Sequence, residues 1–133
     1  MSYRVTRDQT GRPHVRLDGE PPYSRALDAA VRSREPELAR GRWLVLAFPA
    51  WSVPGVAAVG TALDTARRFG GSLQLGIRPF DDPDEHRAWQ PGLEGAGSDP
   101  VWMVLQDGIP CLIQSGHFTE DELVASIDAV FGG

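Results

Sequence analysis

The chain has 133 residues, of which 41% are hydrophobic and 23% are charged, and its formal net charge at pH 7 is −5. This length and composition predict one globular domain with a real core and leave little room for a second domain. The acidic balance argues against a nucleic-acid partner, because nucleic-acid binding depends on neutralising phosphates.

The cysteine count and the distribution of apolar residues limit which cellular compartment and which reactions we expect. No stretch approaches the roughly 20 apolar residues of a membrane span, and the start has no signal-peptide pattern, so we expect a cytoplasmic protein without a membrane partner. The single cysteine, Cys111, excludes an intramolecular dithiol mechanism and agrees with a reducing compartment. All thirteen basic residues are arginine, a codon-usage pattern typical of a GC-rich bacterium.

The N-terminal part is predicted to be an extension, residues 1–22, that precedes a domain at 23–133. The extension is polar and rich in turn residues, and a short alternating segment at 14–17 has the pattern of an edge strand. From Ser24, a residue type that caps helices, apolar residues recur at helical spacing until Pro36 interrupts them. We therefore predict a helix that begins at Ser24.

A strand, a helix and a second strand are predicted next. Residues 43–48 are continuously apolar, as in a strand that is covered on both faces. Residues 56–69 place their apolar side chains on one helical face, and Gly70 and Gly71 provide the stop. Residues 73–77 alternate apolar and polar, which predicts a strand. Three large aromatic residues are assigned to the core: Trp43, Phe48 and Trp102.

The segment at 79–99 is acidic and rich in proline and glycine. We predict a short helix at 84–89 and a loop at 91–97. The carboxylates around His86 include metal-capable oxygens, but no recognised ligand spacing is present. We therefore expect neither a metal nor a cofactor.

A hairpin and a final helix complete the predicted order. The Asp-Gly pair at 107–108 is a strong two-residue turn signal between strands at 101–106 and 109–114. Pro110 lacks an N–H, which assigns the second of these strands to a sheet edge. A capping box at 119–122 begins an amphipathic helix that runs almost to the C-terminal end.

This order of elements, together with several motif residues, resembles the thioredoxin fold over residues 20–131. The segment Trp51-Ser-Val-Pro-Gly55 is similar to the Trp-Cys-Gly-Pro-Cys turn of that family, and Pro100 lies where the family has a cis-proline. Three further residues follow at spacings similar to those of the thioredoxin C-terminal half: Gly108, Gly116 and Leu123. The resemblance implies an α/β domain with a mixed four- to five-stranded sheet flanked by helices.

The two cysteine positions of the redox motif hold other residues. Ser52 stands where the attacking thiolate would be, and its hydroxyl does not ionise near neutral pH. Gly55 offers no second sulfur, and Leu46 stands where the family has a buried acid that assists proton transfer. The resemblance therefore implies a redox-inactive member that is not a dithiol–disulfide oxidoreductase.

The resemblance implies that the former active-site surface binds a polypeptide instead. In thioredoxin relatives the backbone before the cis-proline, here that of Asp99 if the Asp99–Pro100 bond is cis, pairs with an extended peptide as in strand addition. The alternative is that Asp99 and Pro100 form a purely architectural turn. A similar general design is found in the cysteine-less thioredoxin-like chaperones of hydrogenase maturation, so we expect an accessory or chaperone-like role. The expected partner-binding residues are Trp51, Ser52, Val53, Pro54, Asp99, Pro100, Gly116 and His117.

Two alternatives stay open. A non-dithiol enzyme of the same fold would use Cys111 as a lone thiol, or Ser52 with His117 as its base. Against these roles, we expect Ser52 to be an N-cap and Cys111 to be a buried or half-buried inert thiol. A structural subunit would instead form a homodimer through the edge of the hairpin.

Overall fold

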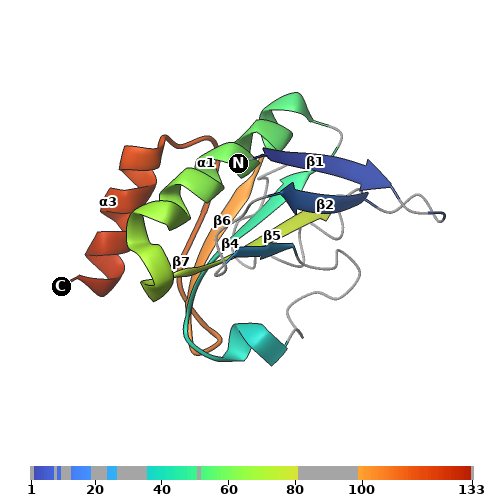
Figure 1. Ribbon diagram of the computed structural model, residues 1–133. Coiled ribbons are helices and arrows are strands. Elements are labelled where there is room, and N and C mark those ends of the chain that lie inside the picture. The colour runs from blue at the N-terminus through green and yellow to red at the C-terminus, as the bar shows by residue number, and fades with distance from the viewer. Residues whose placement is uncertain are drawn as a thin grey trace.

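The computed structural model describes residues 2–7, 9, 13–18, 24–26, 36–50, 52–80 and 99–132. Within these ranges the chain forms a five-stranded mixed sheet with helices packed against it, and a separate two-stranded sheet (Figure 1). The predicted α/β class with a mixed sheet is confirmed.

The five-stranded sheet has the strand order β3-β5-β4-β6-β7. Its strands are β3 (Ser24–Ala26), β4 (Arg42–Pro49), β5 (Gln74–Phe80), β6 (Val101–Gln106) and β7 (Ile109–Ser115). Strands β3 and β4 both run parallel to β5, whereas β6 runs antiparallel to β4 and β7 runs antiparallel to β6. The long crossover between the parallel strands β4 and β5 contains helix α1 (Val53–Phe69).

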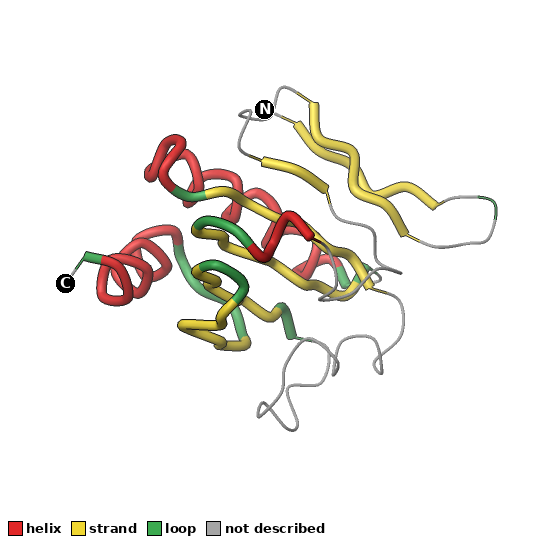
Figure 2. The backbone as a smooth tube through the Cα atoms, turned by 90° about the horizontal axis from the view of Figure 1, so that it is seen from below, coloured by secondary structure: helices red, strands yellow, loops and turns green. Residues whose placement is uncertain are grey.

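Strand β4 lies at the centre of the sheet, and both of its faces are buried. Alternate residues point into two different clusters: Leu44, Leu46 and Phe48 into one, and Trp43, Val45 and Ala47 into the other. Helices α1 and α3 (Glu120–Phe131) cover the first cluster, and Leu38 from the short helix η1 (Pro36–Ala39) packs on the second (Figure 2). Burial on both faces explains why β4 is continuously apolar.

Arg68, in the last turn of α1, forms ion pairs with two residues in the first turn of α3. The Arg68 guanidinium lies 2.7 Å from a carboxylate oxygen of Glu120 and 3.1 Å from one of Asp121. These hydrogen bonds raise the pKa of Arg68 above its ordinary value. Thr119 and Glu122 form the predicted capping box at the start of α3. A short 3-10 helix, η2 (Gly70–Ser72), follows α1.

The hairpin between β6 and β7 has the predicted two-residue turn. Asp107 and Gly108 have φ angles of 51° and 82°, and this left-handed backbone is what such a turn requires. The Asp107 N–H donates to the Gly41 carbonyl, and Asp107 Oδ1 accepts from the Gly41 N–H, both at 2.9 Å. Strand β7 is an outer strand of the sheet, as Pro110 predicted, and its pairing with β6 is interrupted by a bulge at Cys111.

The N-terminal predictions are corrected in part. The strand predicted at 14–17 exists as β2 (Pro13–Asp18), but it pairs with β1 (Ser2–Arg7) in the separate antiparallel sheet. That hairpin contacts β3, β5 and α1. The prediction of an N-cap at Ser24 is wrong, since Ser24 begins β3. Pairing with β5 satisfies the backbone of β3, and this tertiary contact outweighs a weak helical periodicity.

Three other predictions lie outside the described residues. They are the remainder of the helix expected after Ser24, the short helix at 84–89 and the loop at 91–97. The acidic side chains around His86 lie outside the described residues as well.

Candidate functional site

The turn from β4 into α1 is organised by Ser52. Its backbone is extended, its N–H donates to the Pro49 carbonyl at 3.2 Å, and its carbonyl accepts from the Val56 N–H at 2.9 Å. Ser52 Oγ accepts a hydrogen bond from the Gly55 N–H at 3.2 Å. These contacts confirm the prediction that Ser52 is the N-cap of α1.

Ser52→Ala is expected to lower the free energy of unfolding by about 1 kcal/mol, because it leaves a free N–H in the first turn without its acceptor. Urea denaturation followed by circular dichroism measures this change. Ser52→Asp is the matched control, since aspartate caps helices but lacks a hydroxyl, and it should retain near wild-type stability. A cap role is refuted if both variants are equally destabilised.

Gly55 is buried in the first turn of α1 and lies directly against Pro49. A Cβ atom at position 55 would lie 2.8 Å from the Pro49 carbonyl oxygen and 3.0 Å from Pro49 Cδ and Cγ. Real Cβ atoms do not approach backbone atoms so closely, so the turn has no space for a side chain at this position. Gly55 stands where the resemblance places a second cysteine, and this position lacks both a sulfur atom and the space for a side chain. We call it a closed position.

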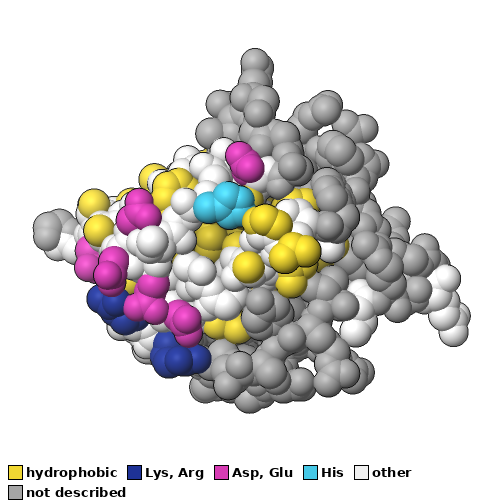
Figure 3. All heavy atoms as spheres, turned by 90° about the horizontal axis from the view of Figure 1, so that it is seen from above, with side chains coloured by type: hydrophobic (Ala, Val, Ile, Leu, Met, Phe, Trp, Pro, Cys, Tyr) yellow, Lys and Arg dark blue, Asp and Glu magenta, His cyan; other side chains and the backbone are white. Residues whose placement is uncertain are grey.

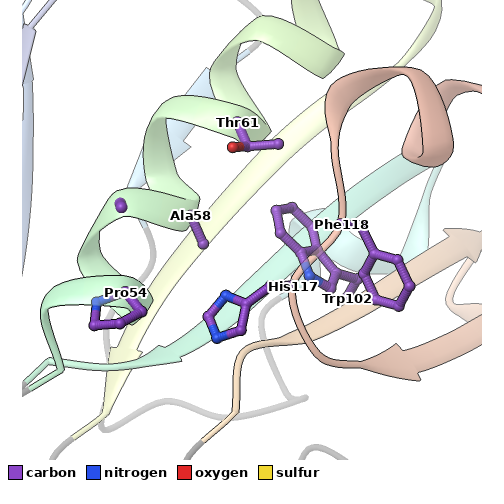
Figure 4. A pocket seen from close by; sticks show the side chains of 7 residues that line it. Pro54, Ala58, Thr61, Trp102, His117 and Phe118 are labelled. Carbon is purple, nitrogen blue, oxygen red and sulfur yellow. The ribbon is translucent and has the colours of Figure 1, made fainter.

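A pocket lies between α1 and the loop that joins β7 to α3. Its volume is about 210 Å³. Its wall on α1 is built from small side chains, and the imidazole of His117 on the opposite wall points toward the N-terminal turn of α1 (Figure 4). The lining residues are Pro54, Ala57, Ala58, Thr61, Trp102, His117 and Phe118.

The wall opposite α1 is held in place by Trp102 and Gly116. The Trp102 side chain is 1% exposed, and its Nε1–H donates to the Gly116 carbonyl at 3.0 Å. The Gly116 N–H donates to the Pro100 carbonyl at 2.9 Å, and Gly116 has a φ of 122°, a conformation that favours glycine. The half-buried Phe118 packs on the main core. The backbone that carries His117 is thus fixed by two hydrogen bonds.

The predicted partner-binding residues fall into different environments. Pro54 and His117 line the same pocket, and Val53, one residue before Pro54, is 83% exposed. Asp99 is exposed, but Pro100 is buried and offers little surface to a partner. Ser52 and Gly116 are intermediate in exposure and are occupied by the hydrogen bonds above. Trp51 lies outside the described residues.

The cis-proline that the resemblance implied at Pro100 is not found. No cis peptide bond occurs among the described residues, and both Asp99 and Pro100 are described, so the bond between them is trans. The trans form of an X–Pro bond is intrinsically favoured by about 0.5–1 kcal/mol, so a proline at this position does not by itself fix the isomer. The expected pairing of a peptide with the Asp99 backbone depended on a cis bond, so the trans bond removes the geometric basis for it.

The candidate catalytic residues are not assembled into a catalytic group. Within the described residues, no hydrogen bond joins Ser52 to His117. Ser52 Oγ instead accepts the hydrogen bond from the Gly55 N–H that caps α1. The prediction that Cys111 is buried is wrong, because the residue is exposed, and its Sγ donates to the Ile109 carbonyl at 3.5 Å. Cys111 lies on the hairpin half of β7, about 13 Å along the strand from Ser115 at the pocket end.

Four of the pocket residues were not anticipated from the sequence. Ala57, Ala58 and Thr61 lie on α1 at helical spacing, and their small side chains leave the space that the pocket occupies. The small residues at helical spacing are a sequence pattern that could have indicated this wall of the pocket. No sequence pattern indicated that Phe118 would line it. Trp102 was predicted as a core residue, which is confirmed, but its contribution to the pocket was not predicted.

The described residues contain neither a cluster of metal ligands nor a helix suited to a membrane. No group of three or more His, Cys, Asp or Glu side chains in this part of the chain is placed to hold a metal ion. Its helices are too short or too polar to cross a membrane. Comparison with known proteins adds no family, since no protein-family model matches the chain and no curated protein matches it significantly.

Proposed function

We propose that this chain is a redox-inactive thioredoxin-like protein that binds a polypeptide partner through its pocket surface, as an accessory or chaperone-like factor. The pocket surface is defined as the seven residues that line the pocket together with Val53. The observation that carries the proposal is an apolar pocket beside an exposed valine, at the helix start where a thioredoxin would keep its thiols.

The arrangement of strands supports the thioredoxin-like part of this proposal. The order β4, α1, β5, followed by the antiparallel β6–β7 hairpin and α3, is the order that the resemblance implies. The parallel pairing of β3 and β4 with β5 also fits it. Redox inactivity is supported by the hydroxyl of Ser52, which caps a helix, and by the closed position at Gly55.

Polypeptide binding is supported by the apolar surface at the start of α1. Val53 and Ile109 are the large hydrophobic side chains that stand exposed among the described residues, and Val53 directly precedes Pro54, which lines the pocket. Apolar side chains grouped on a protein surface commonly mark a protein interaction site. A pocket within such a surface provides a place where one side chain of the partner is anchored.

Photo-crosslinking in living cells of the native host tests this proposal. A benzophenone amino acid placed at Val53 is expected to yield discrete polypeptide adducts after irradiation, identified by mass spectrometry. The matched control is the same amino acid at Ala129, which is exposed near the C-terminal end of α3. Adducts that are absent at Val53, or identical at both positions, would overturn the proposal. An adduct of twice the chain mass would identify self-association instead.

A further inference from the structure

The size of the pocket limits what it can hold. Sites for drug-sized small molecules usually measure about 300–1,000 Å³, whereas this pocket measures about 210 Å³. Its walls are mostly apolar, with Ala58 of α1 on one side and Trp102 and Phe118 on the other, and its polar side chains are His117 and Thr61. These dimensions and walls suit one large apolar side chain rather than a cofactor.

An acidic residue, Asp99, lies at the end of the sheet from which the loop that carries His117 departs. The β6–β7 pairing places Val101 opposite Ser115, and the Gly116 N–H to Pro100 carbonyl bond continues the ladder by one residue. Asp99 and His117 are each the next residue along the chain from this hydrogen-bonded pair, so both lie at the same end of the sheet, where the pocket is. The Asp99 carboxylate is exposed, and none of the ion pairs within the described residues involves it.

Asp99 is one of several acidic residues in the segment that forms one wall of the pocket. The segment 99–132, which supplies one wall, contains no lysine or arginine, and its acidic residues are Asp99, Asp107, Glu120, Asp121, Glu122 and Asp128. Figure 3 shows hydrophobic side chains gathered beside a histidine, with acidic side chains along the surface next to them. Arg68 from α1 pairs with Glu120 and Asp121. A positively charged partner is therefore attracted to this face, and an acidic one is repelled.

We propose that the pocket selects a peptide segment with a large apolar side chain and a neighbouring arginine or lysine, the apolar group filling the pocket and the cation pairing with Asp99. This inference rests on the proposed function, since it names the chemical class of the polypeptide partner. Because Asp99 is exposed, its ion pair is expected to change the affinity only a few-fold, and burial of the apolar side chain supplies most of the affinity.

Selection from a library of random dodecapeptides displayed on phage tests whether an apolar side chain fills the pocket and whether a cation pairs with Asp99. The full chain is immobilised as wild type and as three variants. Ala57→Phe fills the pocket from an exposed position on α1, and Ala129→Phe adds the same ring at an exposed position about 13 Å along α3 from its start. Asp99→Asn removes the negative charge of that carboxylate. Circular dichroism and thermal unfolding verify that each variant is folded.

We expect the selected peptides to share a leucine, methionine or phenylalanine with an arginine or lysine within two positions. Their affinity should fall at least tenfold on Ala57→Phe, stay unchanged on Ala129→Phe, and fall about two- to fivefold on Asp99→Asn. Peptides that lack cationic residues, or that bind Ala57→Phe as well as wild type, would overturn this inference and leave the proposed function standing. A library from which nothing is enriched above a blank surface would overturn both.

Discussion

Trp102→Ala is expected to lower the free energy of unfolding by about 3–5 kcal/mol, the usual cost of truncating a buried tryptophan. The Trp102 side chain is almost fully buried in the cluster beneath α1 and α3, so its removal leaves a cavity. The Gly116 carbonyl also loses the indole N–H that it accepts from. Urea denaturation, with linear extrapolation to water, measures the change.

A second substitution at the same position separates packing from hydrogen bonding. Trp102→Phe keeps most of the apolar volume and loses the indole N–H, so we expect a smaller cost of about 1–3 kcal/mol. The control is Ile109→Ala, which truncates an exposed side chain and should change the free energy of unfolding by less than about 0.5 kcal/mol. A Trp102→Ala variant as stable as Ile109→Ala would contradict the packing described here.

Gly55→Ala is expected to destabilise the protein by about 1–3 kcal/mol, although glycine to alanine inside a helix is ordinarily favourable by about 0.5–1 kcal/mol. The sign is reversed because the new methyl group would meet the Pro49 carbonyl oxygen at 2.8 Å. Gly71→Ala is the matched control, since a Cβ atom there has no other atom within 4 Å, and it should be neutral or slightly stabilising. Thermal unfolding of both variants in the same buffer measures the difference.

The same crowding limits any attempt to introduce a pair of cysteines at this turn. The Cβ of Gly55→Cys meets the same carbonyl oxygen, so the double variant with Ser52→Cys is expected to be less stable than Ser52→Cys alone. It is not expected to reduce insulin disulfides. An active and stable double variant would show that Pro49 moves away at little cost, and the description of a closed position would then be wrong.

Elements with strong local signals could be predicted from the sequence. Strand β4 is long and continuously apolar, α1 has a cap, a periodic face and a glycine stop, and the Asp-Gly pair at 107–108 and the capping box at 119–122 are local motifs. Each of these signals depends only on residues that are close together in the sequence, so it can be recognised without the structure. The N-cap role of Ser52 was predicted for the same reason.

Features that depend on distant contacts could not be predicted. Strand β3 has three residues, and its pairing with β5, about fifty positions along the chain, outweighs the cap-like serine at its start. The closed position at Gly55 depends on where Pro49 places its carbonyl oxygen. The pocket is formed by three elements that meet in space, α1, β6 and the loop before α3, and sequence spacing indicates only the α1 part of it.

The interrupted edge of strand β7 has a consequence for how copies of this protein meet. Pro110 has no N–H to donate, and the bulge at Cys111 breaks the regular spacing of donors and acceptors. An outer strand of this kind is a poor template for a strand from another molecule. Growth of the sheet from copy to copy through β7, as in amyloid or in a homodimer joined along this edge, is therefore disfavoured. Cys111, exposed on the same strand, is instead positioned for attachment of a spectroscopic label.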